Sequence, residues 1–189
     1  MANSVPAITV LAGTNGAGKS SIGGARLEAA RTPLYNPDVE TQALIAANPG
    51  MTLDEANAAA WRIGKERLEA AIAERHSFNF ETTLGGATIT RLLAKAHDNG
   101  LRLRIWYCGL SDAELHIARV RARVRRGGHD IPATKIRERY DASACSAAAL
   151  PRWQDSESSV LHAELGQADR RSRDEPGEVG IDVETARAG

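Results

Sequence analysis

Residues 13–20 read Gly13-Thr14-Asn15-Gly16-Ala17-Gly18-Lys19-Ser20, and this octapeptide decides the fold of the chain. It fits the phosphate-loop pattern G-x-x-x-x-G-K-[ST] at every constrained position. In such a loop, backbone N–H groups point into one concavity, and the helix that follows adds the positive end of its dipole. Lys19 then reaches the β- and γ-phosphates of a nucleotide, and the Ser20 hydroxyl is placed to ligate Mg²⁺.

The residues on either side favour this interpretation over a glycine turn that contains Lys-Ser by chance. Residues 7–12 form a short apolar run suited to a buried parallel strand, and residues 19–30 are Ala-rich and compatible with a helix. Strand, loop and helix in this order are the surroundings that a phosphate loop requires. We therefore expect residues 13–21, including Ser21, to bind the phosphates of a nucleotide.

The composition is that of one globular domain. The chain has 189 residues, of which 42% are hydrophobic and 25% are charged. It contains no apolar run of about 18 residues and no secretory signal pattern. The two cysteines, Cys108 and Cys145, show no metal-ligand spacing, and Cys108 ends an apolar strand pattern typical of core. These features predict a cytoplasmic protein with reduced thiols.

The net charge of zero hides an uneven distribution. Residues 101–140 contain ten Lys and Arg against four Asp and Glu, whereas residues 141–189 contain five against ten. A basic segment in a chain that handles phosphates suggests a clamp on phosphate oxygens, with a nucleic-acid surface as the competing interpretation.

Strand and helix patterns alternate along most of the chain. Strand patterns occupy residues 77–82 and 101–107, a short extended stretch lies at 32–38, and helices are expected between them. Thr52 with Glu55 forms a capping box that opens a helix to about residue 75, and Ser111 with Glu114 forms a second. The sequence thus predicts an α/β fold, a P-loop kinase-like parallel sheet with helices on both faces. Ligands then bind at the carboxyl ends of the strands.

This regularity ends near residue 141. Residues 141–189 contain only seven Leu, Ile, Val or Phe, too few for a core of their own. We therefore expect a kinase-like domain over residues 1–143 and a divergent, poorly ordered tail over residues 144–189. The sheet is expected to lack a C-terminal core strand.

Two carboxylates are candidates for chemistry at the carboxyl edge of the sheet. Asp38 follows the short extended stretch and is the candidate base for an attacking hydroxyl, with an N-cap of the next helix as the competing role. Glu81 ends a strand and is a candidate to grip a substrate hydroxyl or the hydration shell of Mg²⁺, with a solvated strand end as the competing interpretation. Thr82 and Thr83 add hydroxyl groups beside it.

The expected helix after residue 111 carries five arginines. Arg119, Arg123 and Arg126 share one face, where they are candidates to clamp the transferred phosphoryl group, unless they form only an exposed basic face. Arg139 is a candidate for a second cation from the other side. The three tryptophans, including Trp61, show no nucleic-acid stacking pattern and are expected to pack in the core.

In combination, these segments resemble the zeta toxin family of P-loop kinases. The resemblance rests on the phosphate loop, Asn36-Pro37-Asp38, the stretch Phe80–Leu84 and the segment Arg123–Pro132 that leads to Arg139-Tyr140, and it covers residues 8–143. It implies an ATP- and Mg²⁺-dependent kinase that phosphorylates the 3′-hydroxyl of the amino sugar in UDP-N-acetylglucosamine.

The resemblance also implies roles for particular residues and a partner. Asp38 matches the catalytic base, Glu81 the substrate-binding acid, and Arg123 or Arg126 with Arg139 the phosphate-clamping arginines. A toxin of this family is restrained by an epsilon-type antitoxin protein, and neither a membrane nor a nucleic acid is expected as a partner.

The C-terminal part of the chain departs from the family, whose members continue past the Arg-x-Arg-Tyr segment through a helix into a further core strand. Two further hypotheses stay open, the first from the basic segment 101–140 and the second from this departure. One is a P-loop kinase acting on another small molecule or on RNA, and the second is a degenerate nucleotide-binding remnant.

Overall fold

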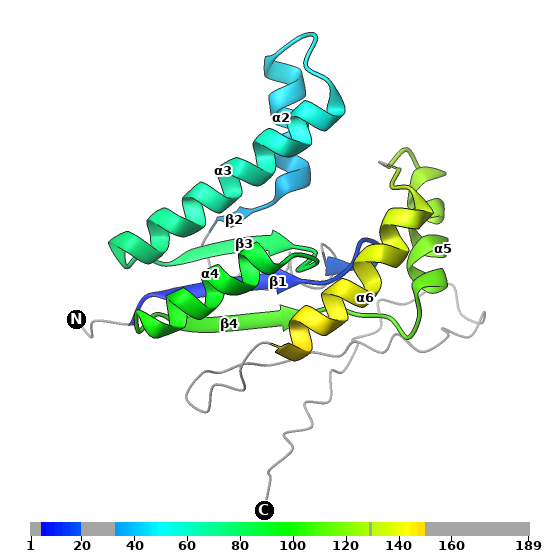
Figure 1. The fold of residues 1–189 in the computed structure, drawn as a ribbon. Helices are drawn as coiled ribbons and strands as arrows, with labels where there is room; N and C mark the ends of the chain where they lie inside the picture. The colour runs from blue at the N-terminus through cyan, green and yellow to red at the C-terminus, as the bar shows by residue number, and fades with distance from the viewer. Residues whose placement is uncertain (1–4, 20–32, 129, 150–189) are drawn as a thin grey trace, which may run out of the picture.

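The computed structural model describes residues 5–19, 33–128 and 130–149. Its elements are β1 (Ala7–Ala12), β2 (Leu34–Tyr35), α2 (Pro37–Ala47), α3 (Leu53–Glu74), β3 (Phe78–Thr82), α4 (Ala87–Asp98), β4 (Arg102–Tyr107), α5 (Ala113–Val124) and α6 (Ala133–Ala149) (Figure 1). The predicted strands at 7–12, 77–82 and 101–107 are each confirmed to within a residue. The first expected helix, beyond residue 19, lies outside the described residues.

The four strands form one parallel sheet in the order β2-β3-β1-β4. β1 lies inside the sheet, with Val10 opposite Phe80 of β3 on one side and Ile105 of β4 on the other. The predicted buried apolar strand and the parallel pairing are thus confirmed, and the fold is α/β as predicted. The phosphate loop follows β1, so it lies at the carboxyl edge of the sheet.

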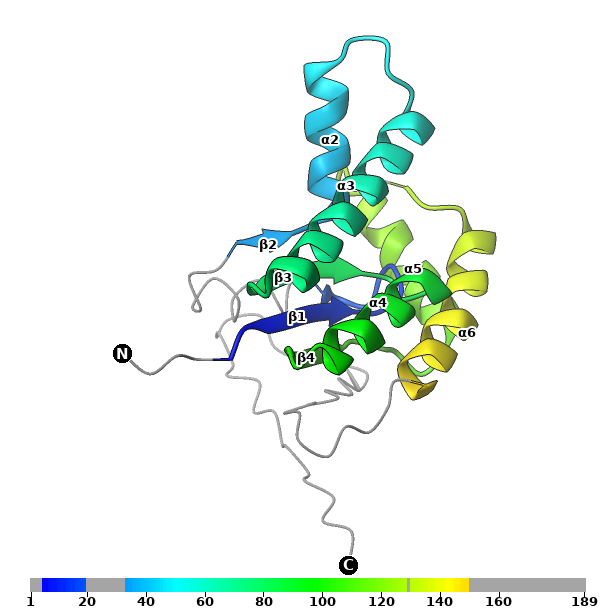
Figure 2. The same cartoon turned by 60° about the vertical axis from the view of Figure 1, so that its left-hand side comes forward.

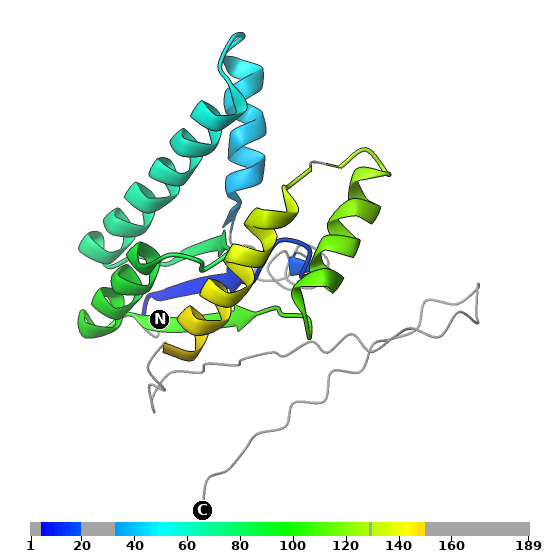
Figure 3. The same ribbon diagram turned by 45° about the vertical axis from the view of Figure 1, so that its right-hand side comes forward.

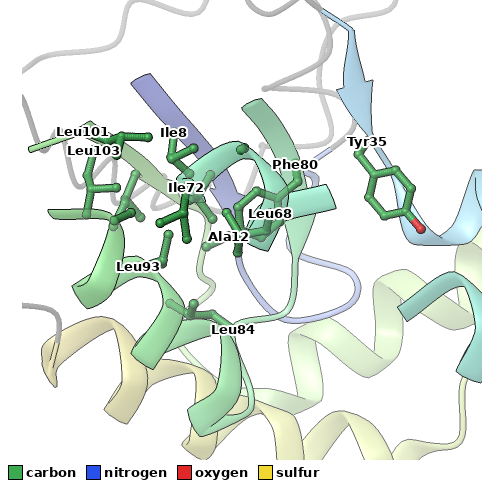
Figure 4. Close-up of a cluster of buried hydrophobic side chains, with 14 of the residues drawn as sticks. Ile8, Ala12, Tyr35, Leu68, Ile72, Phe80, Leu84, Leu93, Leu101 and Leu103 are labelled. Carbon is green, nitrogen blue, oxygen red and sulfur yellow. The ribbon is translucent and has the colours of Figure 1, made fainter. Parts of the chain in front are cut away.

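The main core lies between one face of the sheet and helices α3 and α4. Ile8, Val10 and Ala12 alternate along β1 and pack against side chains that include Leu68 of α3 and Leu93 of α4 (Figure 4). Leu11 points to the opposite face of the sheet, where it belongs to a smaller cluster with Ala17 and Cys108. Cys108 is buried, as expected for a core thiol.

Two helix pairs extend beyond the sheet. α2 rises from β2 and packs along α3 (Figure 2), whereas α5 and α6 lie side by side near the phosphate loop (Figure 3). The capping box that opens α3 is confirmed, because Thr52 Oγ1 accepts from the Glu55 N–H and Glu55 Oε2 accepts from the Thr52 N–H. The second predicted box is wrong: Asp112 rather than Ser111 caps α5 and accepts from the Leu115 N–H at 2.9 Å.

The C-terminal end of the described chain is helical. α6 runs across the predicted domain boundary at residue 143, and residues 150–189 of the expected tail lie outside the described residues. Within the described part of the chain, no helix is long and apolar enough to cross a membrane.

Candidate active site

The phosphate loop is held in place by close contacts with its neighbours. The Gly13 N–H donates to the Thr82 carbonyl of β3 at 3.2 Å. Gly16 has a φ of +86°, and a Cβ at this position would lie 2.6 Å from the His116 carbonyl oxygen of α5. Both the conformation and the space therefore require glycine, and the loop presents backbone rather than side chains. This backbone cradle fits a nucleotide phosphate.

Lys19 lies buried at the end of the loop and faces Glu81. Its Nζ donates to the Gly13 carbonyl at 2.7 Å and lies 3.5 Å from Glu81 Oε1. Burial lowers the pKa of Lys19 and raises the pKa of Glu81, while the attraction between the two charges opposes both shifts. The ammonium and the carboxylate thus stabilise one another where little water reaches either.

The other oxygen of Glu81 is held by Asn36. Asn36 Nδ2 donates to Glu81 Oε2 at 3.1 Å, and Asn36 Oδ1 accepts from the Asp38 N–H at 2.9 Å as the N-cap of α2. The competing role for Asp38, that of an N-cap, is therefore wrong, because Asn36 occupies that position and Asp38 lies in the first turn of α2. Asn36 was not predicted as a site residue, although an Asn before a proline is a recognisable cap signal.

Charged side chains predicted for the site line one cavity of about 580 Å³ at the carboxyl edge of the sheet. They are Lys19, Asp38, Glu81, Arg123 and Arg126. Arg119 lines it too, and its guanidinium lies beside Gly18 of the phosphate loop. The helical spacing places these arginines on one side of α5 and of the turn after it, and this side faces the loop.

The remaining predicted side chains line an adjoining cavity of about 530 Å³. Arg139, Thr82 and Thr83 contribute to it, and Lys19, Asp38 and Glu81 line both cavities. Arg139 is tied to the loop, because its Nη1 donates to Asn15 Oδ1 at 2.8 Å. Ser20 and Ser21, the expected Mg²⁺ and phosphate ligands, lie outside the described residues.

Trp61 is not in the core, contrary to expectation. Its side chain belongs to α3, is 50% exposed and lines the second cavity. The sequence did not indicate that Trp61 is exposed, because an aromatic residue in an Ala-rich helix usually marks the packed face.

His116 joins the phosphate loop to α5 and is fully buried. Its Nε2 accepts from the Leu110 N–H at 3.3 Å, so Nδ1 carries the proton and donates to the Asn15 carbonyl at 3.0 Å. The ring also meets Tyr140 of α6 edge-on, with the ring centroids 5.5 Å apart. Burial lowers the pKa of His116, and the nearby cations Lys19 and Arg119 lower it further, against the hydrogen bond to Asn15.

This neutral histidine predicts a loss of stability in mild acid. The unfolded chain binds a proton at His116 near the ordinary pKa of about 6.5, whereas the folded chain resists protonation, so the free energy of unfolding falls as the pH drops below that value. In urea unfolding between pH 5 and 8, the free energy of unfolding should fall less steeply with decreasing pH for His116→Gln than for the wild type. Parallel curves for wild type and His116→Gln would contradict the prediction.

Comparison with known proteins places this site in a family. Residues 8–144 match the family model AAA_33, described as an AAA domain. A protein of Haemophilus influenzae named as uncharacterized is 31% identical over 128 residues, which span 68% of this chain and 88% of that protein.

Two solved structures share the fold. One is a protein of Chloroflexus aurantiacus to which a kinase function is ascribed, with a TM-score of 0.58 at 17% identity over 72% of this chain and 77% of that one. The other is a chain of the Pnkp1/Rnl/Hen1 RNA repair complex, with a TM-score of 0.56 at 15% identity over 76% of this chain and 46% of that one. At these identities the likeness concerns the fold. The chain belongs to the AAA_33 family of AAA domains and has a P-loop kinase-like, nucleotide-binding fold.

Proposed function

We propose that the chain is an ATP-dependent kinase that phosphorylates the 3′-hydroxyl of the amino sugar in UDP-N-acetylglucosamine. The observation that carries the proposal is the pair of adjoining cavities that share Lys19, Asp38 and Glu81. One cavity lies against the phosphate loop and the arginines of α5, so it suits a triphosphate. The second suits an acceptor, and a hydroxyl at the shared wall would lie between a carboxylate and the phosphoryl group.

Each residue has a distinct role in the proposed transfer. Asp38 accepts the proton of the attacking hydroxyl, because it is an exposed carboxylate at the shared wall. Lys19, Arg123 and Arg126 stabilise the negative charge that spreads over the transferred phosphoryl group. Glu81, oriented by Asn36, accepts a hydrogen bond from a second acceptor hydroxyl.

The second cavity adds contacts for the acceptor. Thr82 and Thr83 line it and offer hydroxyl groups, and Arg139 supplies a cation from α6. Mg²⁺, which Ser20 would ligate, neutralises charge on the phosphate oxygens when it is bound. The resemblance to zeta toxins adds a biological setting in which the chain is the toxin and an epsilon-type antitoxin protein restrains it.

A direct assay tests the activity. Purified full-length protein with ATP, Mg²⁺ and UDP-N-acetylglucosamine should release ADP and yield a sugar nucleotide that is heavier by one phosphoryl group, as measured by mass spectrometry. A folded sample that binds ATP but forms neither product would remove the proposed activity. A sample that binds no ATP would instead support the degenerate remnant.

A second candidate is a kinase that acts on RNA, and the observation that favours it is the distribution of arginines. Arg121 and Arg125 line neither of the two cavities but a third one, which shares Ile131 and Pro132 with the second cavity. An RNA acceptor could use such cations on its backbone, and its apparent affinity would fall steeply with salt. A sugar nucleotide held in the second cavity, here called the acceptor cavity, should bind with an affinity that depends only weakly on salt.

A further inference from the structure

The acceptor cavity has one wall that the proposed chemistry leaves unexplained. Asp54, Asn57 and Trp61 are spaced three and four residues apart along α3, so they lie on one face of this helix, and all three line the cavity. The face is exposed rather than packed, since half of the Trp61 surface remains accessible. A large aromatic side chain on a cavity wall offers a ligand a broad apolar face to cover.

The position of this helix face is fixed by the packing of α2 against α3. Thr41 of α2 is buried, and its hydroxyl donates to Asn57 Oδ1 at 3.1 Å. The amide of Asn57 therefore turns its oxygen toward α2, and its NH₂ group remains to donate to a ligand. The same two helices hold Asp38 at the start of α2 and Trp61 on α3, so the base and the aromatic ring belong to one packed helix pair.

The cavity also has a cationic wall. Lys135 and Arg139 lie one turn apart on α6 and both line it. An acceptor in this cavity thus meets an aromatic face from α3 and two cations from α6, with the Asp54 and Asp130 carboxylates also on the walls. That arrangement suits a molecule that has a ring face and a phosphate group.

We propose that Trp61 is the stacking surface for the phosphate acceptor, which lays a ring face on the indole and turns a phosphate group toward Lys135 and Arg139. This inference rests on the proposed kinase function and identifies the acceptor class within it: a phosphorylated molecule with a ring face, either a sugar or a nucleobase. Trp61 acts in specificity and binding, whereas Asp38 and Lys19 act on the reacting atoms.

Kinetics with the full chain test the proposal. Trp61→Ala should raise KM for UDP-N-acetylglucosamine about tenfold, a typical cost of losing an aromatic stacking contact, while kcat and KM for ATP change less than about twofold. Trp61→Phe should recover most of the affinity, because a smaller ring still stacks. Leu115→Ala is the matched control, since Leu115 is also an exposed hydrophobic side chain, but it lies on α5 and lines neither cavity.

Binding without turnover separates this inference from the kinase proposal. UDP and N-acetylglucosamine 1-phosphate should each be titrated into wild type, Trp61→Ala and Trp61→Phe by calorimetry without ATP. If Trp61→Ala loses affinity for UDP alone, the indole stacks on the base. If it loses affinity for the sugar phosphate alone, the indole stacks on the sugar. Either result supports the inference even if no phosphoryl transfer is found. Unchanged affinity for both ligands, or phosphorylation by Trp61→Ala with an unchanged KM, would overturn it.

Discussion

Replacing Asp38 by asparagine is expected to lower kcat for phosphoryl transfer about 10³-fold, within the range found for the loss of a general base. Asparagine keeps the size and the polarity of the side chain but cannot take up the proton of the attacking hydroxyl. The side chain that caps α2 is that of Asn36, so the helix should form as before. Steady-state kinetics with ATP and UDP-N-acetylglucosamine give kcat, and calorimetry gives the affinity for ATP, which should stay within about twofold.

The control for this prediction lies two residues further along α2. Glu40 is also a carboxylate of the first turn, but it faces Arg67 at 3.9 Å and lines neither of the two adjoining cavities. Glu40→Gln should therefore keep the wild-type kcat. If Asp38→Asn instead loses ATP affinity while its kcat at saturating ATP is preserved, Asp38 would be a nucleotide-binding residue and not a base.

The sequence was sufficient for the parts of this fold that depend on local patterns. The phosphate loop has a fixed spacing, β1, β3 and β4 have continuous or alternating apolar residues, and α3 begins at a capping box that short-range hydrogen bonds define. Parallel strands end at one edge, so the crevice rule predicted that side chains at or beyond the carboxyl ends of β1, β2 and β3 would meet there. Lys19, Asp38 and Glu81 do line the same cavity.

The details that the sequence missed depend on contacts between distant segments. His116 lies 101 residues from Asn15, and no local pattern indicates that its ring bonds the phosphate loop. Trp61 was expected in the core but lines a cavity instead. Part of that cavity comes from residues after 130, and periodicity along α3 cannot show their position. The cap of α5 was placed one residue early, since Ser111 and Asp112 are both good caps and only the backbone geometry selects Asp112.

These distant contacts also explain how α5, α6 and the phosphate loop are joined. α5 touches the loop through the His116 ring, and α6 touches it through Arg139. α5 and α6 are in turn linked by the exposed ion pair between Glu114 and Arg137, at 2.7 Å. The exposed pair contributes little to stability, whereas the buried cluster of Ile117, Val120 and Ile136 packs the two helices together, and the contacts of His116 and Arg139 join them to the loop.

The variant Lys19→Met is expected to show two separate losses. Transfer should fall by about 10³-fold, because the side chain no longer stabilises charge on the transferred phosphoryl group. Stability should fall by about 2 kcal/mol, because Glu81 is left buried without its cation and its pKa, already raised by burial, rises further. Kinetics measure the first loss, and urea unfolding at pH 7 measures the second.

A second substitution separates the two effects of losing Lys19. In Lys19→Met with Glu81→Gln, no uncompensated charge remains at this buried position, and the amide can still meet Asn36, so stability should return most of the way to wild type. Activity should not return, since the phosphate-binding ammonium is still missing. A double variant that regains both stability and transfer would mean that Lys19 serves only to neutralise Glu81, and it would remove the phosphate loop lysine from the mechanism.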